Sequence, residues 1–148
     1  MTKSRVVSRT RIVKAPPSVI FDLLADPGKH ATFDGSGSVL SEKGDVPRLA
    51  LGSTFGMNMK VGLPYSITNT VVEFDEGRQI GWRHFGGHIW RYVLEPVDDG
   101  SATRVTESFD WSTAKSPLFI ELARYPKKNA KSIEKTLDRL AELVESPH

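Results

Sequence analysis

Cysteine and long apolar runs are both absent from this chain of 148 residues. The lack of cysteine excludes a disulfide framework, thiolate metal sites, iron–sulfur clusters and a cysteine nucleophile. No apolar stretch approaches the ~20 residues of a membrane-spanning helix, and the first ten residues, MTKSRVVSRT, lack the apolar core of a signal peptide. We therefore expect a soluble, cytoplasmic protein.

The length is that of one domain. A chain of this size buries roughly 68–70% of its unfolded surface when it folds, so it needs neither a disulfide nor a metal for stability. The three internal histidines, His30, His84 and His88, lack the HExxH context of a zinc site. We predict a single domain over residues 1–148, with no metal and no cofactor.

Negative charge is missing from the first fourteen residues. One interpretation of this basic segment is an arm that binds nucleic acid. The other is a strand whose solvated charges discourage edge pairing. The basic residues alternate with apolar and small side chains, which favours the strand, and we expect no nucleic-acid partner. The five basic residues are Lys3, Arg5, Arg9, Arg11 and Lys14.

The hydrophobic periodicity predicts an α+β fold. Pro17 is suited to open a helix over residues 18–25, and residues 29–33 form one further turn. After Trp111 the period changes from two to 3.6, which indicates a long amphipathic C-terminal helix over residues 117–145. Pro126 interrupts this pattern, so we expect a kink near Arg124 or two abutting helices. The predicted strands cover residues 5–13, 36–42, 54–60, 65–75, 78–85, 89–96 and 102–111.

Successive strands joined by short turns predict an antiparallel sheet of about seven strands, curved around the C-terminal helix. A three-residue turn at residues 86–88 keeps one face of this sheet consistently apolar. One row across that face then reads Thr70, His84, Trp90 and Glu107. At ~4.8 Å per strand, His84 and Glu107 would lie roughly 10 Å apart.

This face has two interpretations. In the first it is a packed core in which hydrogen bonds to neighbours satisfy His84 and Glu107. In the second it lines a cavity with a few polar groups in an apolar wall, the usual composition of a small-molecule site. Burial would lower the pKa of the histidine and raise that of the glutamate. A cavity under roughly 300 Å³ would favour the packed core.

The large inward side chains outnumber what a thin two-layer core commonly uses, which favours the cavity. Our predicted ligand-binding residues are Met57, Met59, Thr70, Val72, Trp82, His84, Trp90, Tyr92, Glu107, Phe109, Leu118 and Leu122.

Four segments resemble the START-like helix-grip superfamily (SRPBCC), in its polyketide cyclase/dehydrase and lipid-transport branch of small bacterial proteins. The first, IVKAPPSVIFDLLADPGKHATF, is similar to that family's opening strand, Ala-Pro pair, short helix and Asp-Pro break. FDEGRQIGW and WRYVLEPVDDGSATRVTESFDW resemble its middle and late strands, and KKNAKSIEKTLDRLAELVE its last helix. The resemblance implies a curved sheet that grips the C-terminal helix, with a cavity between them.

Three functions follow as hypotheses. The resemblance implies binding or transport of a hydrophobic small molecule, such as a lipid, polyketide, sterol or quinone, by a monomer or weak homodimer. The first alternative is a cyclase or dehydratase with His84 and Glu107 as candidate catalytic acid and base. The second is a regulatory or toxin–antitoxin-type interaction protein.

Overall fold

The computed structural model describes residues 4–35, 39–43, 47–61, 63–84 and 86–145. Within them, seven strands form one antiparallel sheet in the order β1-β7-β6-β5-β4-β3-β2. The strands are β1 (Val6–Val13), β2 (Val39–Lys43), β3 (Thr54–Val61), β4 (Leu63–Asp75), β5 (Gln79–His84), β6 (Ile89–Val97) and β7 (Ala102–Asp110). The helices are α1 (Pro17–Leu24), η1 (Pro27–Lys29), α2 (His30–Phe33), η2 (Asp98–Gly100), α3 (Pro117–Leu122) and α4 (Tyr125–Glu145).

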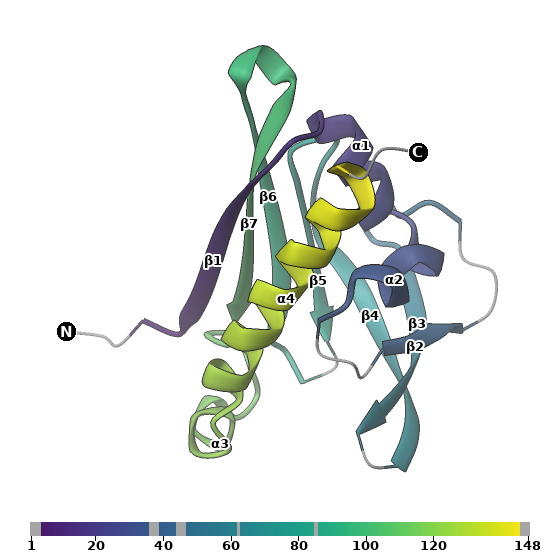
Figure 1. Ribbon diagram of the computed structural model, residues 1–148. Helices are drawn as coiled ribbons and strands as arrows, with labels where there is room; N and C mark the ends of the chain where they lie inside the picture. The colour runs from purple at the N-terminus through teal and green to yellow at the C-terminus, as the bar shows by residue number, and fades with distance from the viewer. Residues whose placement is uncertain (1–3, 36–38, 44–46, 62, 85, 146–148) are drawn as a thin grey trace.

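The sheet curves around α4, which lies diagonally across its inner face, while α1 and α2 close one side (Figure 1). This arrangement confirms the predicted α+β helix-grip fold. The core lies between the sheet and one side of α4, where Ile133, Leu137 and Leu140 are each at most 2% exposed. None of the described helices is long and apolar enough to cross a membrane.

The local breaks follow the chemistry of the sequence. Pro17 occupies the first turn of α1, and the Asp26 carboxylate caps η1 by accepting from the Gly28 amide at 3.0 Å. The predicted long helix is two helices, because Arg124 between α3 and α4 has a φ of +61° that a continuous helix does not allow. Its break confirms the second of the two alternatives that Pro126 suggested.

The basic N-terminal strand faces acidic side chains of the two C-terminal helices. Arg5 pairs with Glu121 of α3 at 3.0 Å, and Arg9 pairs with Glu134 of α4 at 3.2 Å. Arg11 makes the corresponding pair with an aspartate one turn further along α4. Arg5, Arg9 and Arg11 therefore each pair with an acidic side chain of the C-terminal helices. Neither the nucleic-acid interpretation nor the edge-strand interpretation of this basic segment predicted these ion pairs.

Gly35 marks the closest approach of the chain to α4. A Cβ at this position would lie 2.4 Å from the backbone oxygen of Ser132 and 2.6 Å from the backbone nitrogen of Thr136. The Gly35 amide also donates to the Thr136 hydroxyl at 2.8 Å. No side chain fits here, so this contact holds the segment after α2 against the helix.

We expect Gly35→Ala to lower the free energy of unfolding by about 1–3 kcal/mol, because backbone atoms must move to admit the methyl group. Gly86→Ala is the matched control, since a Cβ there meets only ordinary contacts of 3.6 Å and more. Urea denaturation followed by circular dichroism measures both. Equal stability of the two variants would contradict the tight contact.

Candidate functional site

A β-bulge in β4 decides which of its side chains reach the inner face. Val71 lies opposite Trp82 and Asn69 opposite His84, and the register shifts between Val71 and Glu73. Because the bulge adds one residue to β4, the side chains that simple alternation assigns to the inner face on one side of the bulge point to the outer face instead. The predicted positions of Thr70 and Val72 are therefore wrong.

In β5, β6 and β7 the predicted residues do face the inner side of the sheet, but the pairing between neighbouring strands is shifted by two residues from the prediction. Trp82 lies opposite Trp90, and Tyr92 lies opposite Glu107. The predicted single row is thus wrong. His84 lies two strands from Glu107 and four residues further along, or roughly 10 Å across and 13 Å along the sheet.

A cavity of about 170 Å³ lies between the sheet, α2 and the first half of α4. This volume is below the roughly 300 Å³ at which ligand pockets usually begin. By volume alone it favours the packed-core interpretation, but the space is comparable to an engineered cavity of about 150 Å³ that binds benzene. The site is therefore compact, about the size of one ring.

Seven of the twelve predicted ligand-binding residues line this cavity: Met57, Met59, Trp82, His84, Trp90, Tyr92 and Glu107. Phe109 is buried outside the lining, with its ring 4.9 Å from that of Trp90. Leu118 and Leu122 are 64% and 82% exposed, because the break at Arg124 turns α3 away from the apolar side of α4.

The structure adds ten lining residues that the sequence prediction missed: His30, Phe33, Asp34, Phe55, Ile67, Asn69, Asn129, Ser132, Ile133 and Thr136. The lining residues of α4 could have been found from the sequence. Asn129, Ser132 and Thr136 recur at helical spacing on the same side of the helix as the apolar Ile133. Polar side chains on the buried side of a helix mark places where the core is not closely packed with apolar groups.

His30 and Trp82 form the aromatic centre of the cavity. Their rings stack with centroids 5.0 Å apart, and Phe55 meets each of them edge-on at 5.5 Å. His30 Nε2 lies 2.9 Å from the Leu24 carbonyl, which can only accept a hydrogen bond, so this nitrogen carries the proton. Burial lowers the pKa of His30 to about 4, so the ring is neutral at pH 7.

Glu107 and Tyr92 form a buried polar pair on the cavity wall. Burial raises the pKa of Glu107 well above its ordinary value, although the hydrogen bond with the Tyr92 hydroxyl acts in the opposite direction. Burial also raises the pKa of Tyr92, with Glu107 as a further cause. Both groups therefore favour their neutral forms, which confirms the predicted direction for Glu107.

Two buried side-chain oxygens on the cavity wall have no hydrogen-bond partner among the described residues. They are Oδ1 of Asn69 and Oε1 of Glu107, on side chains whose residues are each 4% exposed. An unsatisfied buried acceptor costs about 1–3 kcal/mol, so native proteins rarely keep one without a reason. A ligand with a hydroxyl group, which can both donate and accept a hydrogen bond, is one such reason.

His84 and His88 stack across the turn between β5 and β6, with ring centroids 4.7 Å apart. His84 Nδ1 accepts from the Gly86 amide at 3.3 Å. Burial lowers the pKa of both rings, that of His88 to about 4, and the direction confirms the prediction for His84. Among the described residues, no group of three or more histidines and carboxylates could hold a metal ion.

The family model described as polyketide cyclase/dehydrase and lipid transport matches residues 4–145. The chain belongs to this family. Membership supports a ligand-binding role and confirms the resemblance found in the sequence.

One curated relative and two solved structures are similar to this chain. The uncharacterized protein Rv0088 of Mycobacterium tuberculosis H37Rv is 40% identical over 141 residues, which are 92% of this chain and 62% of that protein. Protein CV1439 from Chromobacterium violaceum has a similar structure at 18% identity, with a TM-score of 0.72 and coverage of 97% of this chain and 99% of that chain. The AHSA1-like protein from Aeromonas hydrophila matches at 17% identity, a TM-score of 0.64 and 97% coverage of both chains. This chain thus spans under two thirds of the length of Rv0088, and the two structures show the shared fold.

Proposed function

We propose that this protein binds a compact, neutral, largely apolar molecule that forms a hydrogen bond with Glu107 through a hydroxyl group. The observation that carries the proposal is Glu107 Oε1, a buried carboxyl oxygen without a partner among the described residues, on the wall of an aromatic-lined cavity. The apolar body of the ligand lies against Trp82 and Trp90. Its burial supplies about 25 cal/mol per Å², and the hydrogen bond orients it.

The size of the cavity limits the ligand. A space of about 170 Å³ holds a single substituted ring, as comparison with the benzene-binding cavity of about 150 Å³ indicates. A four-ring sterol or a long acyl chain is several times larger and needs a wider cavity than this conformation provides. Of the lipid, polyketide, sterol and quinone-like ligands that the resemblance implies, the single ring of a quinone-like molecule is nearest in size. A small phenol or quinol has the same shape and adds the hydroxyl group.

The charge state of the cavity disfavours anionic ligands. At pH 7 His30 is neutral, and burial favours the neutral forms of Tyr92 and Glu107. An anionic ligand would lose its hydration without meeting a cation among these three groups, which carries a large desolvation cost. A phenol is therefore preferred over a carboxylate of the same size.

The catalytic alternative has less support from the geometry. Because His84 lies two strands across and four residues along from Glu107, a ring-sized substrate bound at Glu107 does not also reach His84. The regulatory alternative relied on basic residues of the N-terminal strand and on the run Lys127, Lys128, Lys131 and Lys135 of the last helix. Three of the basic residues near the N-terminus pair with acidic residues of α3 and α4. Ligand binding is thus the function that the site supports best.

Titration with phenol, followed by tryptophan fluorescence and calorimetry, tests this proposal. We expect saturable phenol binding that weakens roughly tenfold in Glu107→Leu, the loss of about one buried hydrogen bond. Glu107→Gln keeps a neutral side chain with an acceptor oxygen and should retain binding. Glu95→Leu, an exposed position on β6, is the matched control. Unchanged affinity in Glu107→Leu, or equal affinity for benzoate, would contradict the proposal.

A further inference from the structure

Four large apolar side chains project from α3 and the first residue of α4. Leu118, Phe119 and Leu122 are 64%, 60% and 82% exposed, and Tyr125 is 41% exposed. The rings of Phe119 and Tyr125 meet edge-on at 6.3 Å. We call these four residues the α3 apolar surface. It lies beyond the N-terminus of α4, at one end of the molecule (Figure 1).

The opposite side of α3 is fixed to the body of the protein. Ile120 is buried, and the Glu121 carboxylate accepts from the Trp111 indole at 2.8 Å and from the Arg5 guanidinium at 3.0 Å. These contacts determine which way the short helix faces. The apolar side chains are therefore held in solvent by the structure.

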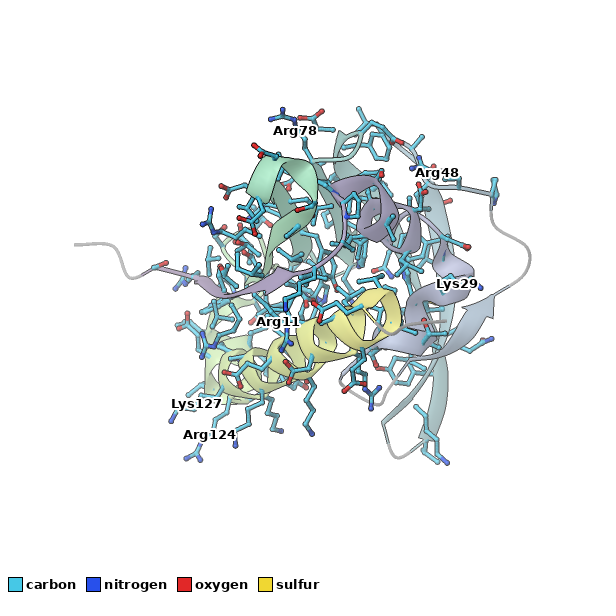
Figure 2. The ribbon with its side chains drawn as sticks, turned by 45° about the horizontal axis from the view of Figure 1, so that its top comes forward. Arg11, Lys29, Arg48, Arg78, Arg124 and Lys127 are labelled. Atoms are coloured by element: carbon cyan, nitrogen blue, oxygen red, sulfur yellow. The ribbon has the colours of Figure 1, made fainter. Side chains whose placement is uncertain are left out.

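Five exposed cations lie next to the α3 apolar surface along the chain, and we call them the basic rim. None of these cations has a carboxylate within salt-bridge distance among the described residues, whereas the nearby acids Glu121 and Glu134 pair with Arg5 and Arg9. Figure 2 shows Arg124 and Lys127 pointing outward from this end. The Lys128 ammonium lies over the Tyr125 ring at 5.8 Å. The basic rim consists of the exposed residues Lys115, Arg124, Lys127, Lys128 and Lys131.

We propose that the α3 apolar surface and its basic rim dock onto an anionic lipid bilayer. Leucine and phenylalanine beside lysine and arginine are the composition of interfacial helices, whose apolar side enters the headgroup region while cations attract anionic lipids. Protein interfaces are depleted in lysine, so a rim that is mostly lysine favours lipid over an acidic protein partner.

The docking surface adjoins one wall of the cavity. Tyr125 begins α4, and Asn129, one turn later on the same helix, lines the cavity. Docking would bring this wall close to the lipid headgroups, where an apolar molecule partitions. The inference stands on the surface of α3 alone and does not depend on which ligand the cavity takes.

Co-sedimentation with lipid vesicles tests the proposal. We expect binding to phosphatidylcholine vesicles that contain about one third phosphatidylglycerol, and little binding to pure phosphatidylcholine. Raising the NaCl concentration from about 0.1 M to about 0.5 M should release the protein, because salt screens the attraction of the rim. Leu122→Glu and Lys127→Glu should each lower the partition coefficient at least about tenfold.

Two matched controls carry the same substitutions elsewhere on the surface. Leu51→Glu alters another exposed leucine, 66% accessible, and Lys29→Glu alters an exposed lysine that Figure 2 shows well away from Lys127. Neither should change vesicle binding. Phenol affinity without vesicles should be the same in Leu122→Glu as in the wild type, so failure of docking and failure of the cavity proposal are distinguishable.

Several outcomes would overturn the inference. The first is no binding to anionic vesicles at low salt, and the second is equal binding by Leu122→Glu. A third outcome is a protein that does not bind vesicles but self-associates, and whose self-association is abolished by Leu122→Glu. That result would show that the surface binds a second copy of the chain. Equal loss of binding in the Leu51→Glu control would show that the attraction is not specific to α3.

Discussion

Replacing Trp82 with alanine is expected to lower the free energy of unfolding by about 3–5 kcal/mol, the cost of removing a large aromatic side chain from a core. The Trp82 ring stacks on His30, meets Phe55 edge-on and lies 5.7 Å from the ring of Tyr92. Its removal deprives all three neighbours of contacts at once. Urea denaturation of the two proteins measures the difference.

The same substitution should also change what the cavity admits. Because Trp82 lines the cavity, Trp82→Ala enlarges it, and we expect the variant to bind a two-ring neutral molecule such as 2-naphthol that the wild type excludes. Trp111→Ala is the matched control, since Trp111 is also buried but lies outside the lining. It should lose stability without gaining naphthol binding. If both variants bind naphthol equally, Trp82 does not set the size limit.

Acidification is expected to destabilise the protein through His30. Its pKa is about 4 in the folded protein and 6.5 in the unfolded chain, so between these values only the unfolded chain binds the proton. The contribution of His30 is complete above pH 6.5 and is lost as the pH falls toward 4. At about 1.4 kcal/mol per pH unit, the loss amounts to about 3 kcal/mol. His88, whose pKa is also about 4, contributes in the same direction.

Glu107 acts in the opposite direction. Its pKa is raised on folding, so its contribution to stability is present below its ordinary pKa of 4.5 and is lost as the pH rises through the folded value. The free energy of unfolding should therefore be measured at several pH values for the wild type, for His30→Phe and for Glu107→Gln. As the pH falls, we expect the free energy of unfolding to decline less steeply in His30→Phe than in the wild type, and more steeply in Glu107→Gln. We call this part of the curve the acid limb. Superimposable acid limbs for the wild type and His30→Phe would contradict the role of His30.

Much of the secondary structure could be predicted from short-range pattern. Alternation located the strands, Pro17 and Asp26-Pro27-Gly28 bounded the first helix, and Pro126 indicated the break that the structure places at Arg124. These signals are local, because a proline or a turn glycine restricts the backbone wherever the rest of the chain lies. The predicted short strand over residues 36–42 overlaps β2 at residues 39–42, and its first residues lie outside the described part of the chain.

The site was predicted only in part, because one irregularity in the sheet changes a whole set of neighbours. Trp82, Trp90, Tyr92 and Glu107 were assigned to the inner face correctly by parity. Counting alternate residues does not reveal the bulge after Val71. This bulge brings Asn69 to the cavity in place of the predicted Thr70.

The sequence by itself determined the α+β class, the order of the elements and the apolar face of the sheet, since each depends on the spacing of side chains along the chain. Only the tertiary structure decided the rows of the sheet, the contribution of His30 from α2 and the outward direction of α3. These depend on contacts between segments far apart in sequence, such as Gly35 against α4 and Glu121 against Arg5. Such contacts exist only once the sheet has closed around the helix, and periodicity within one segment carries no record of them.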